Sequence, residues 1–134
     1  MSARGKARKR ALDILFASEM RDEGPDVALE RAIADGEGPS NDYTATLVRG
    51  VVEHRPEIDR LLGESAQDWS LERMPAVDRN VLRLGVFEVL HVDDVPNAVA
   101  VSEAMNLVRE LSTDESPSFV NGVLGAIVRN HGHS

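Results

Sequence analysis

Residues 101–128 read V-S-E-A-M-N-L-V-R-E-L-S-T-D-E-S-P-S-F-V-N-G-V-L-G-A-I-V and decide the fold class. Apolar side chains recur at three- and four-residue steps up to residue 111, which is the period of an amphipathic helix. Ser116-Pro117 then predicts the start of a second helix, because serine is a favoured cap and proline suits the first helical position. Gly122 and Gly125 would let a neighbouring helix approach closely, which would offset the low helix propensity of glycine.

Helical periodicity extends over most of the remaining chain, and no segment alternates with the period of two that strands require. Residues 75–91 are apolar around most of the helical circumference, which indicates a central helix rather than a peripheral one. Ser40 or Asn41 is a candidate cap for the helix that contains Tyr43. The sequence therefore predicts an all-α protein of about six to seven helices joined by short connections. The expected helices besides 97–111 and the one from 116 are 4–21, 26–34, 40–55, 57–66 and 75–91.

The composition excludes several classes of function. The chain has no cysteine, so disulfides, zinc–thiolate sites and thiol catalysis are excluded. No run of 18 apolar residues occurs, and Asp13 and Glu19 interrupt the segment after the basic start, so we expect a soluble, cytoplasmic protein. His131 and His133 form an H-x-H pair without a visible third ligand, and no H-E-x-x-H, phosphate-loop or G-x-G-x-x-G spacing is present. We expect no enzymatic activity, metal or cofactor.

Positive charge is concentrated at the start of the chain. The first ten residues carry five basic side chains and no acid, whereas the remainder carries ten basic and 23 acidic ones. Cations at the beginning of a helix oppose its dipole and repel one another, so helix stability alone does not favour this placement. Binding of RNA or DNA phosphates would compensate for it, but a plain solvated tail or an anionic membrane surface would also be compatible. If this segment is the RNA site, we expect removal of residues 1–10 to leave the fold intact and to abolish most RNA binding.

Phe16 lies seven residues after Lys9, so the two side chains share a helix face. An aromatic ring beside a basic cluster suits stacking on an unpaired RNA base. Burial in a hydrophobic core is the more ordinary explanation for a phenylalanine, and both interpretations remain open.

Five motifs, in order along nearly the whole chain, resemble the NusB-type family of transcription antitermination factors. Each motif alone is weak, but the ordered set at family-like spacing is specific. The motifs are the Arg/Lys-rich helix Ala3–Phe16, the L-x-x-G-V step Leu47–Val51, the central helix and turn Pro75–Leu90 and Asp94–Pro96, the pair Glu103-Ala104, and the S-x-x-F-x-N-G-V-L element Ser116–Leu124.

The resemblance implies a compact two-lobed helical bundle, with an N-terminal lobe of about 1–55 and a C-terminal lobe of about 56–134. It also implies binding to the boxA element of nascent ribosomal RNA transcripts together with a ribosomal protein, NusE. Other Nus factors and RNA polymerase would complete the antitermination complex.

Matching positions supply the expected contacts of this chain. Arg4, Lys6 and Arg8 would meet the RNA backbone, and Asp78 would face the protein partner. Three further side chains would lie at or beside the RNA surface, although Phe119 could equally be a core residue; these are Phe16, Glu115 and Phe119.

The chain departs from the family at two positions. Gly5 and Ser118 stand where relatives often carry arginine and lysine, so the affinity for boxA RNA would be lower or more dependent on the partner. Two other functions remain open: a detached RNA-binding module related to the N-terminal domain of ribosomal RNA cytosine methyltransferases, and a helical dimerisation domain that forms a homodimer.

Overall fold

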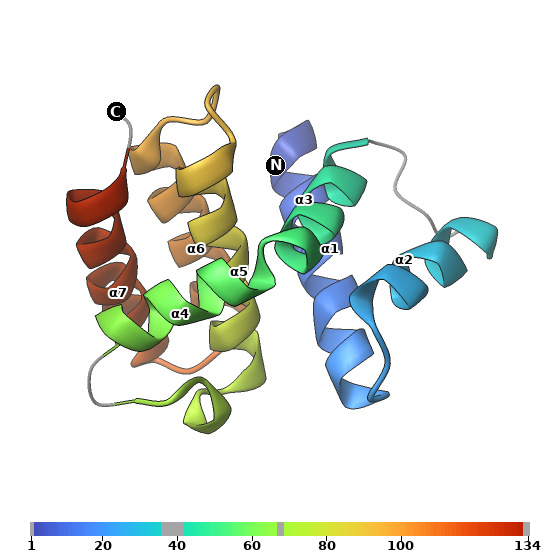
Figure 1. The fold of residues 1–134 in the computed structure, drawn as a ribbon, viewed down its shortest axis with the longest axis horizontal. Coiled ribbons are helices and arrows are strands. Elements are labelled where there is room, and N and C mark those ends of the chain that lie inside the picture. Colours follow the sequence, from blue (N-terminus) through green and yellow to red (C-terminus); the bar gives the residue numbers. More distant parts are fainter. Residues whose placement is uncertain (1, 36–41, 67–68, 133–134) are drawn as a thin grey trace. The chain divides into compact units, whose positions relative to one another are not determined.

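The computed structural model describes residues 2–35, 42–66 and 69–132, which form α-helices and one short 3-10 helix without any strand (Figure 1). The predicted all-α class is therefore confirmed for the described part of the chain. The chain divides into two compact units, Met1–Glu53 and His54–Ser134. Among the described residues, no helix combines the length and apolar character needed to cross a membrane.

The first unit contains α1 (Ala3–Met20), α2 (Pro25–Ala34) and α3 (Asp42–Glu53), and each of these helices packs on the other two. Ser2 caps α1 by accepting a hydrogen bond from the backbone N–H of Gly5 at 3.0 Å. The Thr44 hydroxyl of α3 donates to the backbone carbonyl of Ala7 at 3.2 Å. Aliphatic side chains fill the space between the three helices. They include Ala11, Leu12, Leu15, Leu29, Leu47, Val48 and Val51.

The beginning of α1 belongs to this packed unit and is not a tail. Gly5, Ala7 and Arg8 are buried, and Ala7 accepts the hydrogen bond from α3. The expectation that the first ten residues are dispensable for folding is therefore wrong. Their removal would delete the first two turns of α1 together with that hydrogen bond.

The second unit is built around α5 (Ala76–His91), which contacts α4 (Arg55–Ser65), α6 (Asn97–Leu111) and α7 (Ser116–His131). A 3-10 helix, η1 (Leu71–Arg73), lies between α4 and α5 in the chain. Nine consecutive residues of α5, 81–89, are buried, as its nearly continuous apolar pattern predicts. Figure 1 shows α5, α6 and α7 beside one another, with α4 crossing them.

The polar residues of α5 have specific partners inside the second unit. Buried Arg83 donates from Nε to a carboxylate oxygen of Asp59 on α4 at 2.9 Å and from a terminal nitrogen to the other oxygen at 3.2 Å. The Asn80 side chain donates to the carbonyl of Ala76. The buried guanidinium is thus paired through two hydrogen bonds, the geometry in which burial of a charge is tolerated.

Close approach of two helices in this unit depends on Gly85, and not on the two glycines singled out from the sequence. A Cβ atom at Gly85 would lie 3.0 Å from Cδ1 of Leu124 on α7. A Cβ at Gly122 would meet nothing within 4 Å, and one at Gly125 would meet only Arg129 of the same helix. The prediction for Gly122 and Gly125 is wrong because both lie away from the face of α7 that packs on α5.

Ser116 also differs from its predicted role. Helix α7 begins at Ser116, with Glu115 in the cap position and Pro117 in the first turn, and no side chain caps it. The Ser116 hydroxyl is buried and instead accepts a hydrogen bond from the backbone N–H of Thr113 at 3.3 Å. It thus stabilises the turn before the helix. The candidate caps Ser40 and Asn41 lie outside the described residues.

Candidate nucleic-acid interface

The basic start of α1 is the first part of the candidate interface. Its first turn contains no acidic residue to balance the helix dipole. Arg4 is half-buried, Lys6 is exposed and Arg8 is buried, with only 4% of its surface accessible. The three predicted phosphate contacts therefore differ in how far solvent, and hence RNA, can reach them.

Arg4 and Arg8 lie one turn apart and both approach the aromatic ring of Tyr43 on α3. The guanidinium carbon of Arg4 is 4.4 Å from the ring centroid, and that of Arg8 is 5.8 Å away. Such cation–π contacts hold the two cations against α3. Sequence reasoning missed Tyr43 as a functional residue, because its helical spacing within α3 does not reveal which part of α1 it meets.

Lys6 lies on another side of α1. Two residues rotate a helix by about 200°, so the Lys6 side chain points away from the face shared by Arg4 and Arg8. The three cations do not form a single row along the helix. Of the three, Lys6 is the one fully presented to solvent.

Phe16 is a surface residue, with 36% of its area exposed. Helix α1 is continuous from Lys9 to Phe16, so Phe16 lies two turns beyond Lys9 on the same side of the helix, as the spacing predicts. The core interpretation of Phe16 is therefore wrong, because the apolar stripe of α1 is filled by Ala11, Leu12 and Leu15. An exposed aromatic ring on a basic helix is available for stacking.

The second unit holds the remaining predicted residues around one cavity of about 240 Å³. Asp78 is in the first turn of α5, and Glu115 and Phe119 are at the start of α7. The structure therefore brings together three side chains that lie up to 41 positions apart in the sequence. The other lining residues are Trp69, Met74, Pro75, Thr113 and Ser116.

Trp69 and Phe119 form the aromatic part of this cavity. Their ring centroids are 6.4 Å apart with an interplanar angle of 66°, an edge-to-face arrangement. Trp69 is 51% exposed and Phe119 is half-buried, so neither is a fully buried core residue. Trp69 was not recognised from the sequence as part of the site, since nothing in its local pattern indicates its contact with Phe119 of α7.

The chemistry of the cavity suits a base better than a phosphate. Glu115 is an exposed carboxylate at its rim, and among the residues that the structure describes no lysine or arginine lines the cavity. Carboxylates accept hydrogen bonds from the amino groups of bases but repel phosphate, whereas aromatic rings stack on any base. Ser118 is exposed at the start of α7.

Asp78 is buried, with 2% of its surface exposed. Its carboxylate accepts a hydrogen bond from the Ser112 hydroxyl at 2.5 Å, and that hydroxyl lies 3.0 Å from the Ser116 hydroxyl. Asp78 therefore joins the beginning of α5 to the turn between α6 and α7. This structural role accounts for its burial, and its predicted contact with a protein partner stays a prediction.

A potential metal-ligand group lies elsewhere in the second unit. Among the residues the structure describes, one set of histidine and acidic side chains has ligand atoms close enough to share an ion: His54, Glu57 and His91. None of them lines the aromatic cavity. The H-x-H pair of the sequence is only half described, because His133 lies outside the described residues.

Comparison with known proteins gives one consistent family. The model of the NusB family matches residues 5–129. Over 130 residues, the chain is 73% identical to the transcription antitermination protein NusB of a Nocardioides species, covering 97% of this chain and 96% of that protein. It is 55% identical over 139 residues to the protein of the same name from Beutenbergia cavernae, covering 96% and 91%.

Solved structures agree with the sequence comparison. NusB of T. maritima superposes with a TM-score of 0.88 at 33% identity, covering 99% of this chain and 94% of that one. A chain in the crystal structure of antitermination factors NusB and NusE in complex with dsRNA gives a TM-score of 0.84 at 29% identity, covering 98% and 99%.

Proposed function

Because the chain belongs to the NusB family, whose members are transcription antitermination factors and not enzymes, we propose that it binds the boxA element of nascent ribosomal RNA together with the ribosomal protein NusE. The structure of NusB and NusE with dsRNA supports RNA and NusE as partners. The complex would join other Nus factors on RNA polymerase, in the cytoplasm where transcripts are made.

The observation that carries this proposal is the basic start of α1. Five cations within residues 4–10 oppose the helix dipole, and this segment is packed into the fold rather than loose. Positive charge at the start of a helix is unfavourable for the helix dipole, and RNA phosphates bound there would offset this effect. Lys6 and Arg4 would meet phosphates, while buried Arg8 would support this surface from beneath, on the ring of Tyr43.

Base contacts would come from exposed aromatic rings. Phe16 would stack on an unpaired base beside the α1 cations. In the second unit, the Trp69–Phe119 cavity would take a second base, with Glu115 accepting a hydrogen bond from an amino group. Stacking contributes about 1–3 kcal/mol per base, enough to matter for a protein with few phosphate contacts.

Sedimentation velocity with a labelled boxA oligonucleotide tests the proposal directly, because it reports binding and stoichiometry together. We expect a complex that forms with boxA RNA and is strengthened by NusE, and a weaker complex with an RNA of the same length and shuffled sequence. Equal binding of both RNAs with and without NusE would contradict boxA recognition. The same runs without RNA report whether the chain forms a homodimer.

A further inference from the structure

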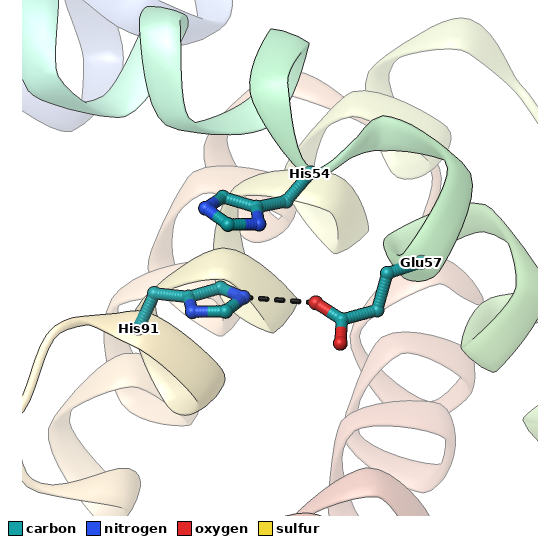
Figure 2. A group of neighbouring side chains, drawn as sticks. All are labelled: His54, Glu57 and His91. Carbon is teal, nitrogen blue, oxygen red and sulfur yellow. Dashed lines mark hydrogen bonds and ion pairs between the residues drawn. The ribbon is translucent and has the colours of Figure 1, made fainter.

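Three side chains of the second unit place metal-binding atoms close together (Figure 2). His54 directly precedes α4, Glu57 is in the first turn of α4, and His91 is the last residue of α5. Their ligand atoms, one from each residue, all lie within 4.8 Å of one another. Two imidazole nitrogens and a carboxylate oxygen form a donor set that zinc and related cations use in proteins.

The two imidazoles are held beside each other by packing. Their ring centroids are 3.8 Å apart and their planes differ by 19°. The ring of Phe87 on α5 lies 6.1 Å from His54 and 5.7 Å from His91. Because Phe87 is only 6% exposed, it gives both histidines a fixed apolar support.

The charges of the group favour a cation. His91 Nε2 lies 2.9 Å from a carboxylate oxygen of Glu57, and this hydrogen bond holds the pKa of Glu57 below its usual range. Glu57 is therefore ionised at neutral pH. The side chains of His91 and Glu57 are 30% and 45% exposed, which leaves a path for an ion from solvent.

We propose that His54, Glu57 and His91 form a binding site for one divalent transition cation of the zinc class, with water completing its coordination. The stacked rings would turn about their Cβ–Cγ bonds to aim their lone pairs at the ion, a torsion that is broad for histidine. The cation would take the place of the proton shared by His91 and Glu57. It would connect the beginning of α4 to the end of α5 within the second unit.

The chain offers a matched control, because it has four histidines and no cysteine. One double variant, His54→Asn with His91→Asn, removes both imidazoles of the group. The control variant, His131→Asn with His133→Asn, removes the same number of imidazoles from the H-x-H pair. Glu57→Gln is a third variant that keeps the shape of the exposed side chain while removing its charge.

Isothermal titration of each metal-free protein with zinc chloride, at pH 7.5 and moderate salt, measures stoichiometry and affinity. The wild type and the control variant should each bind one zinc ion at the proposed site with the same affinity. The His54/His91 variant should lose this binding, and Glu57→Gln should weaken it by about tenfold or more, since loss of even an outer-shell partner of a metal ligand costs about 10–100-fold in affinity. Circular dichroism checks that each variant folds.

A second readout separates a built site from loose surface binding. Cobalt(II) bound by nitrogen and oxygen ligands in the fold gives visible absorption bands, which should appear with the wild type and the control variant and be absent from the His54/His91 variant. The proposal is overturned if zinc binding persists in the His54/His91 variant, if it disappears in the control variant, or if the wild type binds no zinc.

Discussion

Asp78 shows how one buried carboxylate joins two segments of the second unit. Its side chain accepts the Ser112 hydroxyl and lies in the first turn of α5, where negative charge also complements the helix dipole. Charge reversal at this position would place a cation in a buried, hydrogen-bonded site. Such a variant would lose stability whether or not a partner binds there, so a milder change is needed to examine its role.

Replacement of Asp78 by alanine should lower the free energy of unfolding by about 2 kcal/mol, because the Ser112 hydroxyl loses a charged acceptor in a buried site. Asp78→Asn keeps an acceptor oxygen and should cost about half as much. Urea denaturation of both variants measures the difference. An alanine variant as stable as the wild type would show that the hydrogen bond to Ser112 contributes nothing.

The positions of the candidate site residues along the chain could be predicted from the sequence, but the exposure of their side chains could not. The contacts of the α1 cations and of Asp78, Glu115 and Phe119 were predicted from the family resemblance, and the last three residues line one cavity. The exposure of Phe16 and the burial of Arg8 were not predictable, because each depends on which side of α1 the other helices cover. Tyr43 and Trp69 were missed because their contacts come from distant segments.

Helices of the second unit pack at a distance set by individual side chains. Gly85 of α5 lies against Leu124 of α7, which has no exposed surface and so little room to move. Periodicity located these helices within one or two residues at most ends, because the apolar stripes are long and regular. It did not reveal which glycine faces a neighbour, since that depends on the rotation of each helix against the next.

Gly85→Ala and Gly122→Ala form a matched pair of variants, because each adds one methyl group to a helix of the second unit. The higher helix propensity of alanine should raise the free energy of unfolding of both variants by up to about 1 kcal/mol. At Gly85 the new methyl group would press on Leu124, and overpacking of about 1–3 kcal/mol should make this variant less stable than the wild type. At Gly122 the methyl group meets open space, so this variant should be more stable. Thermal unfolding checks both signs, and a stabilised Gly85→Ala protein would contradict the packing argument.

The turn between α1 and α2 is held by an ion pair. Glu23, in the turn after α1, accepts two hydrogen bonds from Arg31 of α2, each 2.6 Å long. These bonds hold the pKa of Glu23 below its usual value of 4.5. A carboxyl with a lowered pKa in the folded state stabilises the fold above its usual pKa, and the effect is lost as the pH falls through the folded-state value.

The melting temperature of Glu23→Gln should therefore lie slightly below that of the wild type at pH 6, and the difference should shrink as the pH falls below 4.5. The effect should be small because the pair is exposed to solvent. Calorimetry at pH 6 and pH 3 measures it. A difference that stays constant between pH 6 and pH 3 would show that ionisation of Glu23 is not its source.

The protein combines an acidic overall composition with a basic start of α1. Beyond residue 10 the chain carries 23 acidic and ten basic side chains, so its average field repels RNA. Screening at physiological salt limits each charge to about 8–10 Å, which lets a local cationic surface act despite that field. Composition predicted this division of charge, and the fold shows that the cationic segment is part of a packed helix.

The salt dependence of boxA binding by Lys6→Gln tests most directly whether the start of α1 holds the RNA. Each phosphate contact with single-stranded RNA contributes about −0.7 to the slope of log affinity against log salt concentration. Two contacts, from Arg4 and Lys6, predict a wild-type slope of about −1.4, whereas a contact from Arg8 as well would give about −2. The matched control is Arg129→Gln, which removes the same charge from an exposed position in α7.

Fluorescence anisotropy with a labelled boxA oligonucleotide over a range of salt concentrations gives the slopes. We predict that Lys6→Gln weakens binding and makes the slope less steep by about 0.7, while Arg129→Gln leaves the slope at its wild-type value. Equal slopes for the wild type and both variants, with equal affinities, would contradict the assignment of the RNA contact to the start of α1.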